Sequence, residues 1–257
     1  MKKWPFLLLI ALIFSACGNT WIPISIDQTL GEQAKDGIIQ DPANYKILEE
    51  QDCPNTYKML EELRDKILKN GNLTHKNDFT WEIKIIEDDS VLNAFCVPGG
   101  YIFIYTGLIK YLNSKAAIAG VLGHEMAHAD QRHSTKQMAK QLGLSVILQY
   151  VLGIDHSSLL NLGINLLTLS FSRGDESEAD YKSVEYLNGT DIDSRGAAFF
   201  FEQLIDETNK EVAPEFISTH PNPENRIENI YAKWKELGAK KGNRYELEYK
   251  STIQDLP

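Results

Sequence analysis

The sequence is short of basic residues, of cysteine and of long apolar runs. Its 257 residues contain 26 Lys and Arg against 36 Asp and Glu, which gives a formal net charge of −10. A surface that follows a phosphate backbone needs a basic stripe, so this deficit argues against nucleic acid as a partner. Repeats with a period of about 20 to 50 residues are also absent, which excludes a solenoid or tandem array. With 43% hydrophobic and 24% charged residues, the composition is that of a globular protein.

The first apolar run is short and ends at a cysteine. Two lysines precede residues 4–14, and small residues lead directly to Cys17. The run is below the roughly 17 to 25 residues of a transmembrane helix, and its pattern predicts a secretory signal over residues 1–16. Small residues before a cysteine resemble the lipobox of bacterial lipoproteins, so we expect Cys17 to be lipidated and residues 17–24 to form a tether. The alternative is an ordinary cleaved signal, or an uncleaved anchor, with an unmodified Cys17.

The predicted lipid anchor places the protein in a bacterial cell envelope, facing the periplasm. Gly18 follows Cys17 where an inner-membrane retention signal would have Asp, so the outer membrane is favoured. Cys53 and Cys96 would then lie in an oxidising compartment, where a disulfide can persist. Two alternatives stay open for this pair: a disulfide bridge, or two small buried apolar side chains.

Hydrophobic periodicity predicts a small sheet early in a mainly helical chain. We expect one domain over residues 25–237 and a polar, basic tail over 238–257 that ends in an extended segment. The predicted strands are 81–85, 91–95 and 101–105, and the predicted helices are 27–39, 55–70, 115–133, 134–152, 157–171, 176–187, one starting near 194, and 221–237. The helices 134–152 and 157–171 are strongly apolar but are separated by a break, so we interpret them as buried or lid helices; a membrane-facing hairpin is the alternative.

A metal-binding pattern lies inside the predicted helix 115–133. Residues four apart share one face of a helix, so His124 and His128 can bind a single metal ion. Glu125 lies beside that face, where it can take a proton from water. The surrounding residues are apolar, and two histidines and a glutamate would be costly to bury there without a ligand.

A hydrolytic zinc site needs a third protein ligand and an open position for water. Glu176 and Asp180 are four apart, so one carboxylate could bind the metal while the other orients a ligand imidazole. Glu178 faces away from this pair, and spacing alone does not choose between the two faces. His133 is nine residues after His124, on the opposite side of one continuous helix, and we expect it to be structural.

Four blocks of the sequence together resemble a known family. They are Asn93-Ala94-Phe95 with Pro98-Gly99-Gly100; the HExxH motif at 124–128; Ser172-Arg173 with Glu176, Glu178, Ala179 and Asp180; and Ser218-Thr219-His220-Pro221 with Arg226. In order and spacing they are similar to the zinc metallopeptidases that include the CAAX prenyl protease, HtpX and the BepA-type periplasmic proteases. The resemblance implies an α+β, mainly α-helical, zincin-like fold with a small sheet packed beside the HExxH helix.

The same resemblance implies roles for individual residues. One Zn²⁺ per chain would be held by His124, His128 and Glu176, with Glu125 as the catalytic general base. Asp180 would support a ligand from outside the metal shell. His220 matches a histidine that can occupy the open metal position and hold the enzyme off, and Arg226 matches the arginine of that block; a role in stabilising the oxyanion is the other possibility for both. The strand at Asn93, with Pro98, Gly99 and Gly100, would present an edge on which an extended substrate pairs.

The function implied is zinc-dependent hydrolysis of peptide bonds in unfolded or misassembled cell-envelope proteins. Only the predicted tail 238–257 follows the last predicted helix, so we expect no repeat domain of the BepA type and a similarity to the small single-domain lipoprotein members. Two other interpretations remain: a zinc-bound periplasmic chaperone or binding lipoprotein with little proteolysis, and a plain lipoprotein whose HExxH motif binds no metal. The sequence does not predict the oligomeric state.

Overall fold

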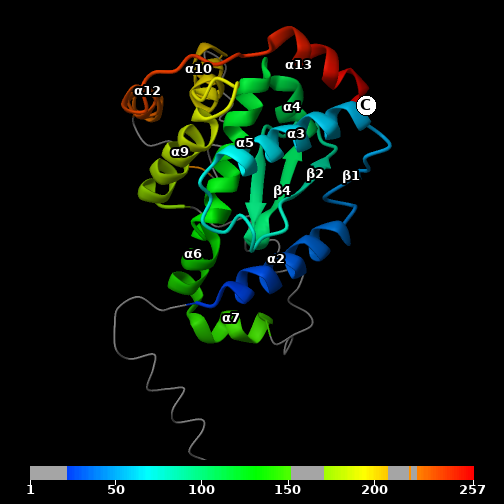
Figure 1. Ribbon diagram of the computed structural model, residues 1–257. Coiled ribbons are helices and arrows are strands. Elements are labelled where there is room, and N and C mark those ends of the chain that lie inside the picture. Colours follow the sequence, from blue (N-terminus) through cyan, green and yellow to red (C-terminus); the bar gives the residue numbers. More distant parts are fainter. Residues whose placement is uncertain (1–21, 152–170, 208–219, 221–224) are drawn as a thin grey trace, which may run out of the picture.

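The computed structural model describes residues 22–151, 171–207, 220 and 225–257 (Figure 1). The predicted signal 1–16, Cys17 and residues 157–170 of the second apolar segment lie outside the described residues. Among the described helices, none combines the length and the apolar character needed to cross a membrane.

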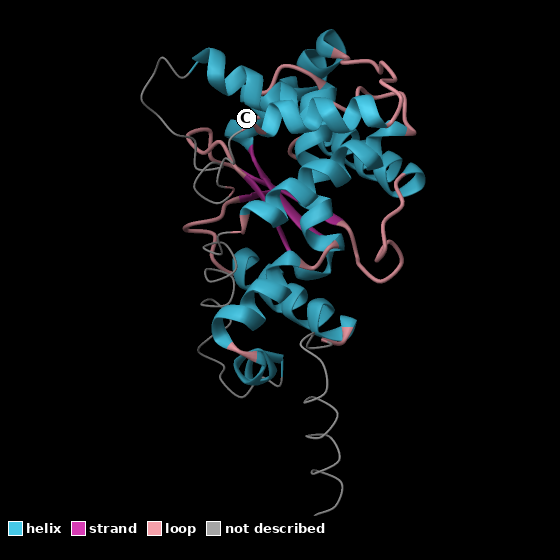
Figure 2. Cartoon of the chain, turned by 90° about the vertical axis from the view of Figure 1, so that its left-hand side faces the viewer, coloured by secondary structure: helices cyan, strands magenta, loops and turns pink. Residues whose placement is uncertain are grey.

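A four-stranded mixed sheet lies inside a mainly helical fold, which confirms the predicted fold class (Figures 1 and 2). Its strands are β1 (Ile47–Leu48), β2 (Glu82–Ile86), β3 (Ala94–Val97) and β4 (Tyr101–Tyr105), in the order β1-β2-β4-β3. The β2 and β4 strands are parallel, and the other two pairs are antiparallel. Every residue of β4 is buried, because alternate side chains enter two different apolar clusters on the two faces of the sheet.

The helices follow the predicted order but differ at several ends. The predicted helix 115–133 ends at Asp130, and the predicted helix 134–152 is two helices separated by Gly143, whose φ is 82°. The predicted extended ending contains a helix, and β3 begins later than the predicted 91–95 strand. The helical elements are α2 (Ile24–Ile39), α3 (Pro54–Asn70), η1 (Pro98–Gly100), α4 (Thr106–Tyr111), α5 (Lys115–Asp130), α6 (His133–Leu142), α7 (Leu144–Val151), α9 (Arg173–Asn188), α10 (Gly196–Glu207), α12 (Arg226–Glu236), α13 (Glu246–Thr252) and η3 (Ile253–Asp255).

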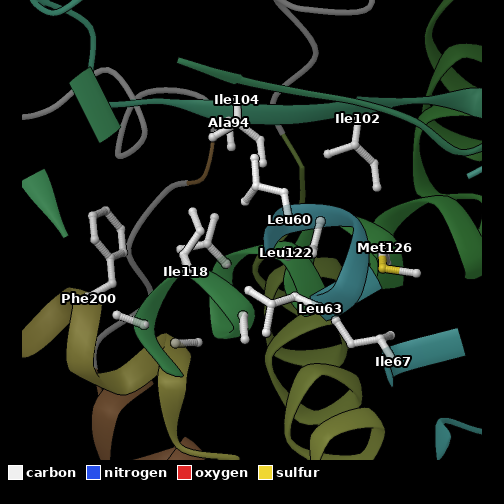
Figure 3. Packing of buried hydrophobic residues seen from close by; sticks show 14 of the residues in the cluster. Leu60, Leu63, Ile67, Ala94, Ile102, Ile104, Ile118, Leu122, Met126 and Phe200 are labelled. Carbon is white, nitrogen blue, oxygen red and sulfur yellow. The ribbon is translucent and has the colours of Figure 1, made fainter. Parts of the chain in front are cut away.

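Helix α5 lies at the centre of the core. Ser114 caps its N-terminus by accepting a hydrogen bond from the Ala117 N–H at 3.2 Å. Beyond Lys115 every residue of the helix is buried, which is typical of a helix surrounded by other elements. Figure 3 shows side chains of α5 packed between α3, the sheet and α10: Ile118, Leu122 and Met126 lie among Leu60, Leu63, Ile67, Ile102, Ile104 and Phe200.

Small residues bring α9 against α5. A Cβ atom added to Gly123 would lie 2.8 Å from the Ser183 Oγ, so a larger residue would push the helices apart. Ser183 in turn donates a hydrogen bond to the carbonyl of Gly120 at 2.8 Å. Helix α9 begins with a capping box between Ser172 and Asp175. This packing places the first turn of α9 beside the HExxH residues of α5.

Candidate metal centre

Four buried side chains meet where α5, α9 and the segment before α12 come together. His124 and His128 come from α5, Glu176 from α9, and His220 from the segment before α12. One possible ligand atom from each lies within 4.8 Å of those of the other three. The Nε2 atoms of His124 and His128 are 3.0 Å apart and face each other across the cluster.

This donor set fits zinc. Two nitrogens bound at about 2.05 Å in a tetrahedral arrangement are about 3.3 Å apart, close to the separation of the two Nε2 atoms. The Oε2 atom of Glu176 is buried and makes no hydrogen bond, as expected of an oxygen that is available to bind a cation. Two histidines and one glutamate form one of the usual ligand sets of catalytic zinc, which leaves a fourth position for water or substrate.

Asp180 supports His124 from behind. Its Oδ1 lies 3.0 Å from the Nδ1 of His124, so the ring can donate to the carboxylate while Nε2 faces the cluster. Arg226 donates to both oxygens of the same carboxylate, at 2.7 Å from Nε and 2.6 Å from Nη2. Burial alone would raise the pKa of Asp180, but the positive charge of Arg226 lowers it below its ordinary value, so the carboxylate stays ionised.

Arg226 is fully buried between two carboxylates. Its third nitrogen, Nη1, makes no hydrogen bond and lies 3.2 Å from the Oε2 of Glu176. The guanidinium also lies over the ring of Phe201, 4.3 Å from its centroid. Arg226 therefore reaches the cluster through Asp180 and Glu176, on the side of the carboxylates.

Glu125 and His220 face each other beside the cluster. The Nε2 of His220 is 3.5 Å from the Oε1 of Glu125, and its Nδ1 is 3.1 Å from the Oε1 of Glu176. Glu125 is 1% exposed and its Oε1 makes no hydrogen bond. Burial raises the pKa of Glu125 toward neutral pH. A carboxylate with a raised pKa is a better proton acceptor.

Comparison with known proteins identifies the family. Residues 54–233, which is 180 of 257 residues, match the family described as Peptidase family M48. The chain belongs to this family. The matched range holds the whole metal cluster and strands β2, β3 and β4 of the sheet, and the resemblance drawn from the four sequence blocks is confirmed.

Several metallopeptidases are similar to the chain over part of their length. The mitochondrial metalloendopeptidase OMA1 of Schizosaccharomyces pombe is 34% identical over 161 residues, covering 60% of this chain and 47% of the relative. OMA1 of Arabidopsis thaliana is 32% identical over 154 residues, covering 60% and 31%. The beta-barrel assembly-enhancing protease of Escherichia coli K12 is 31% identical over 159 residues, covering 56% and 32%. The aligned part of the chain thus spans about a third to a half of these relatives.

The structure brings most of the predicted site residues together. Glu176, and not Glu178, points into the cluster, with Asp180 behind His124. The Asn93 side chain instead caps the start of β3, accepting from the Ala94 N–H at 2.9 Å, and Pro98–Gly100 packs against α2, where a Cβ on Gly31 would meet the Pro98 carbonyl. The predicted residues that converge on this site of the peptidase family are His124, Glu125, His128, Glu176, Asp180, His220 and Arg226.

Two aromatic rings contact the second histidine of the family's HExxH motif, and the sequence placed neither of them at the site. The ring of Phe171 stacks on His128, with centroids 4.1 Å apart and 25° between the planes. His133 also contacts His128, with Nδ1 to Nδ1 at 2.9 Å. The prediction that His133 faces away from the site was wrong, because α5 ends at Asp130 and the chain turns before His133. No periodicity in the sequence signals that turn.

The two described cysteines are free and buried, so the second alternative for this pair is confirmed. Burial raises the pKa of Cys96 well above its ordinary value, and the nearby Glu125 carboxylate raises it further. The raised pKa favours the neutral thiol of Cys96 over the reactive thiolate.

Proposed function

We propose that the chain is a zinc-dependent metalloendopeptidase that hydrolyses peptide bonds of unfolded or misassembled cell-envelope proteins. One observation carries the proposal: Glu125 lies buried beside a cluster of His124, His128 and Glu176 whose possible ligand atoms lie within 4.8 Å of one another. The names of the relatives, a metalloendopeptidase and a beta-barrel assembly-enhancing protease, support the same chemistry. The proposed location in the cell envelope depends on the lipoprotein signal expected at Cys17.

Each residue has one task in this mechanism. His124, His128 and Glu176 hold one Zn²⁺, which when bound supplies Lewis acidity to a carbonyl and to water. Glu125 accepts a proton from the attacking water and delivers it to the amide nitrogen as the carbon–nitrogen bond breaks. Asp180 keeps the His124 ring oriented, and Arg226 keeps Asp180 ionised. The alternative role for Arg226 and His220 is to supply positive charge to the oxyanion of the tetrahedral intermediate.

The edge of the sheet suits an extended substrate. Strand β3 is last in the strand order and pairs with β4 on one side. A substrate backbone that pairs with β3 near Asn93 is recognised through its main chain, which favours unfolded segments over one sequence. Pro98, Gly99 and Gly100 end β3 in a tight turn that fixes the end of this edge.

The test compares Glu125→Gln with wild type on a denatured substrate such as casein, with and without a chelator. We expect wild type to contain one zinc per chain and to cleave casein, and the variant to keep zinc and lose cleavage. The matched control is Glu236→Gln, which removes an exposed carboxylate at the end of α12. Cleavage by a zinc-loaded Glu125→Gln protein would refute the role of the base. Bound zinc without wild-type cleavage would instead indicate a zinc-bound chaperone, and the absence of zinc would indicate an incidental motif.

We also propose that His220 holds the enzyme in check. The side chain is 2% exposed, and its Nδ1 lies 3.4 Å from the ligand nitrogen of His124. An imidazole in that place excludes water from the fourth metal position. His220→Ala is therefore expected to raise casein cleavage and to cause self-cleavage, seen as fragments on a gel. Equal or lower cleavage would assign His220 to catalysis or to no functional role.

A further inference from the structure

His133 joins the proposed zinc ligand His128 to the protein surface. On one side its Nδ1 is 2.9 Å from the Nδ1 of His128. On the other side its Nε2 is 3.3 Å from the Oε2 of Glu178 and 3.8 Å from the Oδ1 of Asp175. The His133 side chain is 1% exposed, whereas that of Glu178 is 49% exposed. The three side chains thus form a line of hydrogen bonds from the buried cluster to solvent.

The direction of these hydrogen bonds follows from the way His128 faces the cluster. Its Nε2 lies 3.0 Å from the Nε2 of His124 and 3.5 Å from the Oε1 of Glu176. A nitrogen that binds a metal carries no proton, so neutral His128 holds its proton on Nδ1. That N–H can donate only to an unprotonated Nδ1 of His133. The His133 proton is then on Nε2, from which it donates to the Glu178 carboxylate.

We propose that His133 is the positioning residue of His128, and that Glu178 fixes the tautomer of His133 in which its Nδ1 accepts. The inference rests on the proposed function and deepens its zinc site. The two ligand histidines then have different supports: His124 donates to the carboxylate of Asp180, and His128 donates to a neutral imidazole. A hydrogen-bond acceptor at the other nitrogen of a metal-binding imidazole holds the ring in orientation and raises the basicity of the ligand nitrogen.

The fold fixes His133 in this place through helix α2. Arg132 has φ of 59°, a left-handed conformation uncommon for residues other than glycine, and it reverses the chain between α5 and α6. Its guanidinium donates to the Oδ2 of Asp27 at 2.6 Å and 3.1 Å. Asp27 is 1% exposed, and its Oδ1 accepts a hydrogen bond from Thr135 at 2.7 Å. Both sides of His133 are therefore tied to α2.

The test measures zinc affinity of the full chain by competition with a chromogenic chelator, together with the absorption spectrum of the cobalt-substituted protein. His133→Leu replaces the imidazole with an apolar side chain of similar size and so removes the Nδ1 acceptor. We expect this variant to bind zinc about 10- to 100-fold more weakly than wild type. His133→Asn offers a carbonyl oxygen near the position of Nδ1 and is expected to restore most of the affinity and the wild-type cobalt spectrum. The matched control is His75→Leu, which removes an imidazole paired with Asp78 at 2.9 Å outside the site.

Glu178 provides a second test that leaves the core intact. Glu178→Leu is expected to weaken zinc binding less than His133→Leu, and Glu178→Gln to restore it, because an amide oxygen still accepts from Nε2. The inference is overturned if His133→Leu and Glu178→Leu bind zinc as wild type does. It is also overturned if His133→Asn loses as much affinity as His133→Leu, since that result indicates packing alone. Wild type without zinc affinity refutes the proposed function and this inference together, whereas zinc binding without proteolysis leaves the inference standing.

Discussion

At the scale of single residues, Asp180 serves two buried partners at once. It accepts from His124 and from the guanidinium of Arg226, and neither partner has contact with solvent. Asp180→Asn removes the negative charge and breaks the bidentate ion pair with Arg226 in the core, which leaves Glu176 as the neighbouring carboxylate of the guanidinium. We expect the metal-free protein to lose about 3 to 5 kcal/mol of unfolding free energy, measured by urea denaturation. The control is Asp65→Asn, which removes an exposed carboxylate paired with Arg64. This change should alter the unfolding free energy by about 0.5 kcal/mol or less.

The difference in stability between wild type and Asp180→Asn should depend on pH. Burial raises the pKa of Asp180, but the charges and hydrogen bonds of Arg226 and His124 together lower it below its ordinary value in the folded protein. Its stabilisation is therefore complete above the unfolded pKa of about 3.9 and is lost as the pH falls through the lower folded pKa. The difference in unfolding free energy between wild type and Asp180→Asn should have its full value near pH 5 and narrow below about pH 4. A difference that stays constant down to pH 3 would contradict this assignment.

The sequence predicted the site residues unevenly, for a physical reason. His124, His128 and the pair Glu176 and Asp180 share helix faces, so a period of 3.6 residues was enough to group each pair. No local rule relates His220 to either helix, and it came only from the resemblance to a family. Its contacts depend on how segments 96 residues apart in the chain are packed.

At the scale of elements, the close approach of α5 and α10 depends on two glycines. A Cβ atom on Gly120 would lie 2.0 Å from the Ala197 nitrogen, and one on Gly196 would lie 1.8 Å from the Ala116 carbonyl oxygen. Backbone atoms cannot move aside as flexible side chains do. Gly120→Ala should therefore force the two helices apart and destabilise the protein by about 1 to 3 kcal/mol or more, measured as a lower urea midpoint.

Gly174→Ala is the matched control in another helix. Its added Cβ atom would lie 3.6 Å from the Ser172 Oγ, an ordinary contact. Because alanine loses less conformational entropy than glycine in a helix, this variant should be neutral or more stable by about 0.5 to 1 kcal/mol. Equal destabilisation of both variants would show that the close spacing of α5 and α10 is not what makes Gly120→Ala unfavourable.

The ends of elements were less predictable than their presence. Alternation of apolar and polar residues located β2, and the turn signal at residues 98–100 located the start of β4, with errors of one residue or none. The end of α5 was misplaced because the local sequence continues to favour a helix through His133. The tertiary pair between Arg132 and Asp27, 105 residues apart, fixes the left-handed turn that ends it. Such a contact is invisible to a local pattern.

At the scale of the whole molecule, the C-terminal segment closes the fold. Tyr249 of α13 is 0% exposed, and its hydroxyl donates to the carbonyl of Ile109 at 2.6 Å. Asp255 accepts from the Asn55 N–H at 2.6 Å and from the Thr56 hydroxyl at 2.6 Å, so it caps the N-terminus of α3 from the other end of the chain. Helix α3 packs on α5 in turn (Figure 3), which links this segment to the helix that carries the HExxH motif.

Loss of the Tyr249 side chain should therefore destabilise the whole domain. Tyr249→Ala removes a buried ring and leaves the Ile109 carbonyl without its hydroxyl donor, so we expect a loss of about 3 to 5 kcal/mol of unfolding free energy. Leu247→Ala is the control on the same helix, since Leu247 is 85% exposed, and should change it by about 0.5 kcal/mol or less. Because α13 contacts α3 and α5 but contributes no residue to the metal cluster, the folded variant should keep wild-type affinity for zinc at the proposed site. A Tyr249→Ala protein as stable as Leu247→Ala would show that residues 246–255 only rest on the domain surface.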